Sequence, residues 1–317
     1  MTVVVDDTGL LNGVCGPNDQ NLKQIEELFH VPVFLRGNEI FFQTEDPSVT
    51  PLLSKMITEL EAHTKEGHIP GKDLITGIFE SLKSGDGTGN SENLSLLKDK
   101  YIEIPSSKKR VYPRGVNQAK YIEGMERNDI SFGIGPAGTG KTFLAVAYAL
   151  QEIFSKRKRK LILTRPVVEA GESLGFLPGD LAQKLNPYLR PLYDAMDALV
   201  SFETISRLEE SRVIEIAPLA YMRGRSISNS IIILDEAQNT TKSQMKMFLT
   251  RIGEGSKALV TGDLTQSDLP KSQESGLLEA VSLLQNIEGI HMSRFDAQDV
   301  VRHRLVQKII HAYEKNS

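Results

Sequence analysis

Short apolar runs alternate with longer stretches of helical periodicity along residues 105–317. The apolar runs predict strands at residues 130–134, 161–163, 213–216, 231–234, 258–260 and 290–292. The periodic stretches predict helices near residues 115–127, 141–155, 179–199, 241–252, 274–285 and 298–314. Strands that alternate with helices are typical of a parallel sheet with helices on both faces. We therefore expect an α/β fold for this part of the chain.

The pattern before residue 84 is different. Helices are expected at residues 21–29 and 49–60, and strands at residues 31–35 and 40–42 around a turn. This α–β–β–α order resembles a KH-type RNA-binding module, but no clear G-x-x-G lies between the helices. A KH-shaped domain that serves protein contacts or packing is an equal alternative.

Residues 84–93 are Gly, Ser, Asn, Asp, Thr and Glu without apolar periodicity. Such a composition predicts a flexible linker. The domain organisation we expect is a small α+β KH-like domain over residues 1–83, a linker over 84–104 and the α/β domain over 105–317.

Composition adds few constraints. A net charge of −4 and a pI near 5.9 neither indicate nor exclude a nucleic-acid partner, because a local basic face is enough for binding. The single cysteine, Cys15, has no internal disulfide partner. No apolar run reaches transmembrane length, and Asp6 and Asp7 interrupt the amino terminus early. We expect a cytoplasmic protein with no membrane partner.

The segment between the strand at 130–134 and the following helix reads GPAGTGKT and matches G-x-x-x-x-G-K-[ST] at every fixed position. In a strand–loop–helix context, backbone N–H groups and the helix dipole both face a phosphate anion. Lys141 is then expected to reach the β- and γ-phosphates, and Thr142 to ligate Mg²⁺. The nucleotide-binding candidates are Gly135, Pro136, Ala137, Gly138, Thr139, Gly140, Lys141 and Thr142.

Two adjacent carboxylates, Asp235 and Glu236, follow the apolar strand at 231–234. Ligands bind at the carboxyl ends of strands in an open α/β sheet. Asp235 is therefore the candidate to hold Mg²⁺ opposite Thr142, and Glu236 is the candidate general base for an attacking water. Together with the phosphate loop, these residues predict a Mg²⁺-dependent ATPase with ATP and Mg²⁺ as its ligands.

Further candidates lie at other strand ends and along basic stretches. Gln266, supported by Asp263, is the candidate to contact the γ-phosphate or its water, and Gln118 to read the adenine edge. Arg165 is a candidate for a polynucleotide phosphate, with a strand-end ion pair as the alternative. The basic stretches at 98–114 and 156–160 suit phosphate contacts, although charge runs are more often solvated surface.

The order of these pieces resembles the first half of a superfamily 1 helicase core. It runs from Gln118 through the phosphate loop, Thr164-Arg165-Pro166, LDEAQN at 234–239 and Gly262-Asp263 to Gln266. The order is closer still to that of the PhoH-like ATPase family, in its version with a KH-like amino-terminal domain. The segment DVVRH at 299–303 also resembles that family. That resemblance implies a RecA-like P-loop fold, ATP binding and hydrolysis, and a cytoplasmic role in RNA metabolism.

The chain departs from true helicases in one respect. Their second lobe supplies an arginine to the γ-phosphate, whereas about 50 residues follow Gln266 here, too few for another such lobe. If an arginine finger is used, it must then come from this domain or a neighbouring subunit, with Arg294, Arg302 and Arg304 as candidates. Arg302 is the catalytic assignment, with an ion pair to Asp299 as the alternative. We therefore expect a homo-oligomer, a hexameric ring by analogy with single-lobe RecA-type ATPases.

Two functions remain open from the sequence. One is an ATPase that remodels or unwinds single-stranded RNA. The other is a slowly hydrolysing, ATP-gated adaptor for RNA or ribosome maturation that recruits an endoribonuclease. A kinase or a GTPase is disfavoured, because a kinase has little need of Glu236 and no N-K-x-D guanine signature is present.

Overall fold

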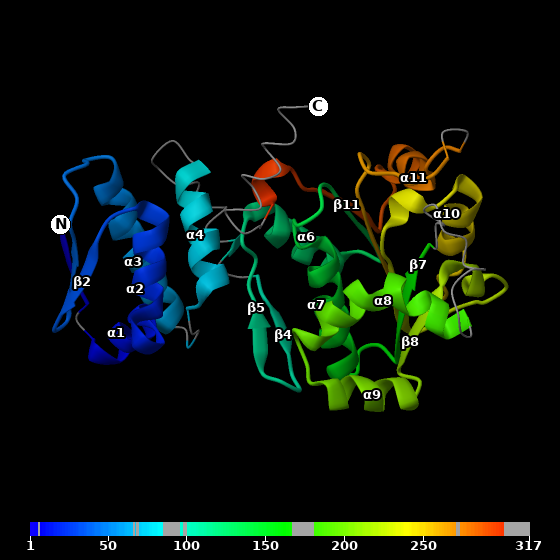
Figure 1. The fold of residues 1–317 in the computed structure, drawn as a ribbon, viewed down its shortest axis with the longest axis horizontal. Helices are drawn as coiled ribbons and strands as arrows, with labels where there is room; N and C mark the ends of the chain where they lie inside the picture. The colour runs from blue at the N-terminus through cyan, green and yellow to red at the C-terminus, as the bar shows by residue number, and fades with distance from the viewer. Residues whose placement is uncertain are drawn as a thin grey trace. The chain divides into compact units, whose positions relative to one another are not determined.

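The computed structural model describes residues 1–5, 7–65, 67, 70–84, 96–97, 100–166, 181–270 and 273–300. The chain divides into two units (Figure 1). One comprises Met1–Tyr101 with Val111–Ala119, and the other comprises Ile102–Arg110 with Lys120–Ser317. The predicted linker and the predicted last helix lie largely outside the described residues.

The amino-terminal unit is a three-stranded antiparallel sheet packed against helices. The strands β1 (Thr2–Val4), β2 (Val33–Arg36) and β3 (Glu39–Phe42) pair in the order β1-β3-β2. The helices are α1 (Thr8–Cys15), α2 (Gln20–Phe29), α3 (Val49–Lys65) and α4 (Lys72–Ser84), with a 3-10 turn, η1 (Pro17–Asp19), between the first two. Beyond the predicted α–β–β–α run, the unit therefore contains β1, α1 and α4.

One face of this sheet forms the core, because alternate residues of a strand point to opposite sides. Ile40 and Phe42 on β3 are buried and pack with Ile25 of α2 and Leu53 of α3. Phe34, which pairs with Phe41 across β2 and β3, is instead 55% exposed. The opposite face of the sheet is thus open and carries aromatic side chains.

The second unit contains a six-stranded sheet in which all neighbouring strands are parallel. Its strands are β6 (Ile130–Ile134), β7 (Lys160–Arg165), β8 (Ile214–Pro218), β9 (Ser230–Leu234), β10 (Lys257–Gly262) and β11 (Ile290–Arg294). They lie in the order β11-β6-β10-β9-β7-β8. This is a RecA-like P-loop α/β fold and confirms the predicted fold class. A separate two-stranded sheet joins β4 (Ile102–Ile104) and β5 (Lys109–Val111).

Helices cover both faces of the large sheet. The α-helices are α6 (Val116–Arg127), α7 (Lys141–Phe154), α8 (Leu181–Asp197), α9 (Phe202–Glu210), α10 (Lys242–Leu249) and α11 (Gly276–Leu284). The 3-10 turns are η3 (Leu219–Met222), η4 (Ala237–Asn239) and η5 (Ala297–Asp299). On one face, α7 contacts β7, β9 and β10 (Figure 1). On the other, Phe248 of α10 and Leu277 of α11 pack with Ile232 of β9 and Val260 of β10.

The core explains why the central strands read as unbroken apolar runs. Ile231, Ile232, Ile233 and Leu234 of β9 have no solvent exposure, as expected for a parallel strand buried on both faces. Because the strands are parallel, the residues that follow β6, β7, β9 and β10 all lie along one edge of the sheet.

None of the helices in the described part of the chain is both long and apolar enough to span a membrane.

Candidate nucleotide site

The loop between β6 and α7 requires glycine at several positions. Gly135, Gly138 and Gly140 have φ values of 151°, 89° and 81°, in the region that L side chains rarely adopt. A Cβ atom on Gly135 would also lie 2.4 Å from the carbonyl oxygen of Phe295. Gly140 is the N-cap of α7, so the loop ends at a helix amino terminus, which favours anions.

Lys141 is folded against this loop. Its Nζ donates hydrogen bonds to the carbonyl oxygens of Gly135 at 2.7 Å and Pro136 at 2.8 Å, and the residue is 8% exposed. Thr139 Oγ1 donates to the same Pro136 oxygen at 3.0 Å. Burial lowers the pKa of the Lys141 ammonium, and the carboxylates of Asp263, Asp235 and Glu236 offset part of that effect.

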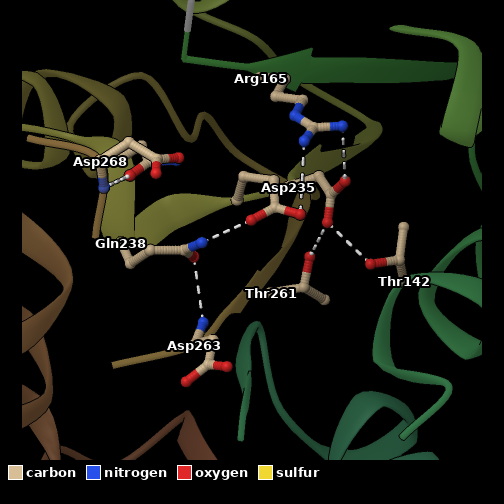
Figure 2. Close-up of polar contacts among 9 residues, drawn as sticks. Thr142, Arg165, Asp235, Gln238, Thr261, Asp263 and Asp268 are labelled. Carbon is tan, nitrogen blue, oxygen red and sulfur yellow. Dashed lines mark hydrogen bonds and ion pairs between the residues drawn. The ribbon is translucent and has the colours of Figure 1, made fainter. Parts of the chain in front are cut away.

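Asp235 joins the loop to the sheet. Its Oδ1 accepts hydrogen bonds from Thr142 Oγ1 and from Thr261 Oγ1, both at 2.7 Å (Figure 2). Its backbone N–H donates to the Thr164 carbonyl at 2.9 Å, which fixes the residue at the tip of β9. The two residues that the sequence predicts as magnesium ligands, Thr142 and Asp235, therefore lie in direct contact.

Glu236 is held in a strained conformation by its surroundings. Its φ of 52° is left-handed, a backbone cost that concentrates at functional sites. Glu236 Oε1 lies 3.3 Å from Arg165 Nη2, and Glu236 Oε2 accepts a hydrogen bond from Gln238 Nε2. Gln238 Oε1 in turn accepts from the Asp263 backbone N–H at 3.0 Å (Figure 2).

The loop and the strand ends enclose a cavity of about 260 Å³. Its lining residues are Ala137, Gly138, Gly140, Lys141, Thr142, Phe143, Asp235, Glu236, Gly262, Asp263 and Gln266. Asp263 is 5% exposed, and its Oδ1 accepts hydrogen bonds from the backbone and hydroxyl of Thr265. Within the described part of the chain, the buried Asp263 Oδ2 has no hydrogen-bond partner. Gln266 also lines this cavity, and its contact with a γ-phosphate or water stays a prediction.

Of the remaining candidates, Gln118 and Arg294 are in the described part of the chain and do not line this cavity. Gln118 belongs to the amino-terminal unit, is buried, and accepts a hydrogen bond from the Arg114 backbone N–H at 2.8 Å. Arg294 ends β11 beside Ile134 and is exposed. Arg302 and Arg304 lie outside the described residues.

The basic stretch at 156–160 precedes the amino end of β7, whereas Arg165 ends that strand. Arg157 pairs with Glu152 at 2.7 Å, and Lys158 Nζ donates to the Gly255 carbonyl. In the other stretch, Arg114 pairs with Asp73 and Lys109 Nζ donates to the Ala198 carbonyl. The 156–160 stretch therefore lies at the edge of the sheet opposite the cavity.

Sequence reasoning assigned no role to Thr261 or to the Gln238 side chain, although both contact the predicted carboxylates. The available signal was a polar residue inside an apolar strand for Thr261, and a glutamine two residues after the second acid for Gln238.

The parallel sheet, the glycine loop and the acids at the strand tips define the class of RecA-like P-loop α/β proteins. A family model described as "PhoH-like protein" matches residues 110–314. The chain belongs to the PhoH-like protein family.

Named relatives support this assignment. A "PhoH-like protein" of Mycobacterium tuberculosis (strain ATCC 25618 / H37Rv) is 46% identical over 307 residues, covering 96% of this chain and 85% of the relative. A "PhoH-like protein" of Bacillus subtilis (strain 168) is 46% identical over 303 residues, covering 95% and 93%. "Protein PhoH" of Escherichia coli (strain K12) is 42% identical over 236 residues, covering 74% and 65%.

Proposed function

We propose that this protein is a Mg²⁺-dependent ATPase of RNA metabolism. The observation that carries the proposal is the contact of Thr142, at the start of α7, with Asp235 at the tip of β9, with Glu236 beside them at the cavity. Nucleoside triphosphatases use this set of groups: a helix that begins at a glycine loop, a hydroxyl group and two acids at the end of a strand.

The residues present suit both ligands. Backbone N–H groups of the glycine loop and the Lys141 ammonium provide the positive charge that a triphosphate requires. The Thr142 hydroxyl and the Asp235 carboxylate are hard oxygen donors of the kind that Mg²⁺ prefers. When bound, the ion would neutralise charge that develops on the β- and γ-phosphate oxygens.

The chemical step needs one proton acceptor. The oxygen of a water forms a bond to the γ-phosphorus, and the bond between that phosphorus and the β–γ bridging oxygen breaks, giving ADP and phosphate. Glu236 accepts the water's proton as general base and later releases it to solvent. Lys141 stabilises the charge on the phosphates, and Gln266 is positioned on the cavity wall to orient the water.

Separating binding from turnover tests these roles. Glu236→Gln should bind ATP with little change but lose hydrolysis by about 10²-fold or more, because it removes the base and keeps the Asp235 carboxylate. Lys141→Ala should lose both binding and turnover. Nucleotide binding and phosphate release are measured on the same preparations. Normal hydrolysis by Glu236→Gln would show that another group accepts the proton.

The RNA part of the proposal rests on the family and on the order of motifs along the chain. We propose that residues 1–83 form a KH-like domain, joined by 84–104 to the ATPase domain at 105–317, in a cytoplasmic protein that acts on single-stranded RNA.

We also propose that the protein assembles as a homo-oligomer, a hexameric ring in which Arg302 or another arginine reaches a neighbouring site. A monomeric mass by sedimentation with Mg²⁺ and ATP would argue against the ring.

The charge and surface of the amino-terminal unit favour a second candidate, the adaptor. Residues 1–84 hold 13 acidic and 6 basic side chains, which opposes contact with phosphates. The open sheet face exposes Phe34 and Val4, as protein-binding surfaces do. An adaptor would hydrolyse ATP slowly and change its affinity for an endoribonuclease partner when ATP binds, which a binding assay with and without ATP measures.

A further inference from the structure

Arg165 occupies a position that the ATPase mechanism above leaves unused. It ends β7, beside the tip of β9, and its side chain is 21% exposed. Its Nη2 lies 3.3 Å from Glu236 Oε1, and its Nη1 lies 4.0 Å from Asp235 Oδ2 (Figure 2). The Arg165 guanidinium therefore faces both carboxylates that have a proposed role in hydrolysis, Asp235 and Glu236.

The two oxygens of Glu236 are held in different ways. Oε2 accepts from Gln238, which is 3% exposed and is itself fixed by the Asp263 backbone N–H. Oε1 faces Arg165, which solvent can reach. Because Gln238 is buried and is held by a second hydrogen bond, the contact with Arg165 is the Glu236 contact that can be exchanged.

A guanidinium exchanges one anion for another readily, because its fork of N–H donors fits carboxylate and phosphate equally well. A strand phosphate that reached Arg165 would compete directly with Glu236 Oε1. Glu236 would then keep only the Gln238 contact and could turn one oxygen toward a water. Arg165 at the end of β7 can therefore couple two anionic ligands, ATP in the cavity and a phosphate of the RNA strand.

We propose that Arg165 is a positioning residue that restrains Glu236 until a polynucleotide phosphate takes its guanidinium, so that strand binding accelerates hydrolysis. This inference rests on the proposed ATPase function and adds the route by which RNA acts on it.

The experiment compares wild-type protein with Arg165→Ala and Arg165→Lys, and uses Arg127→Ala as a control. Arg127 is a surface arginine that forms an ion pair with Glu123, and its side chain is 73% exposed. Phosphate release is measured with and without single-stranded poly(U), and poly(U) affinity is measured against salt without nucleotide. Thermal unfolding verifies that each variant is folded.

Arg165→Ala should raise turnover without RNA by about fivefold or more, which corresponds to about 1 kcal/mol of activation free energy, and poly(U) should add little further. The slope of log affinity against log salt should fall by about 0.7, the loss of one phosphate contact to a single strand. Arg165→Lys keeps a charge but not the fork, so it should restore part of both properties. Arg127→Ala should match wild type.

Two results would overturn the inference while leaving the ATPase intact. Turnover of Arg165→Ala that falls without RNA would make Arg165 a stabiliser of the transition state. An unchanged ratio of RNA-stimulated to basal turnover would remove it from the coupling. If wild-type protein releases no phosphate, or poly(U) has no effect on it, the proposed function fails first and the inference fails with it.

Discussion

Asp235 accepts hydrogen bonds from two hydroxyl groups that come from different elements, Thr142 at the start of α7 and Thr261 on β10. The sequence predicted Lys141, Thr142, Asp235 and Glu236 as neighbours because a phosphate loop and a strand ending in acids share one edge of a parallel sheet. Thr261 could not be predicted in the same way. Its contact exists because β10 lies beside β9, and the spacing of motifs contains no information on which strands are adjacent.

Thr261→Val tests the support that this hydroxyl gives to Asp235. Valine has nearly the same shape, so the change removes one of two hydrogen bonds to Oδ1. Groups that orient a metal ligand typically contribute 10- to 100-fold in metal affinity. We expect the Mg²⁺ concentration for half-maximal ATP hydrolysis to rise roughly tenfold. Thr58→Val, which removes a helix-surface hydroxyl in the amino-terminal unit, is the control. An unchanged Mg²⁺ dependence would mean that Thr142 alone orients Asp235.

At the scale of elements, apolar runs located all six strands of the large sheet, since β6, β7, β9 and β10 each contain four or more buried residues and β8 and β11 each begin with an apolar residue. Their order was beyond the sequence, because it depends on pairings between residues far apart in the chain. Helix α9 was not predicted either. Its apolar residues Phe202, Ile205 and Leu208 recur at helical spacing, but the helix is only 9 residues long, too short for periodicity alone to identify it.

The packing of α11 against the start of α10 depends on Gly276. A Cβ there would lie 2.5 Å from the Thr241 carbonyl oxygen and 2.7 Å from Met245 Cβ. The Gly276 N–H also donates to the Thr240 carbonyl at 2.7 Å, which holds the backbone in place. The close approach at Gly276 and this hydrogen bond join the helix to the segment that follows Glu236.

Gly276→Ala should therefore lower the free energy of unfolding by about 1–3 kcal/mol, the usual cost of overpacking. Urea denaturation measures the change. Leu278→Ala on the same helix is the matched control, because Leu278 is 58% exposed and its loss should stay within about 0.5 kcal/mol. Equal unfolding midpoints for Gly276→Ala and wild type would show that α11 can move away from Thr241 at little cost.

At the scale of the whole molecule, charge is distributed unevenly. With 13 acidic and 6 basic side chains in residues 1–84 and a net charge of −4 overall, the rest of the chain has a net positive charge. The proposed contact with RNA is therefore favoured electrostatically in residues 85–317, which also contain Arg165 and the cavity. Overall composition suggested no such difference, because the two contributions largely cancel in the total.

The most direct measurement is phosphate release from ATP by purified protein of known mass, with and without single-stranded RNA, at fixed salt and Mg²⁺. We expect measurable hydrolysis that requires Glu236 and rises at least severalfold when RNA is added. Hydrolysis that is slow and identical with and without RNA would contradict the RNA-coupled motor and favour the ATP-gated adaptor. The absence of any hydrolysis would contradict the ATPase itself.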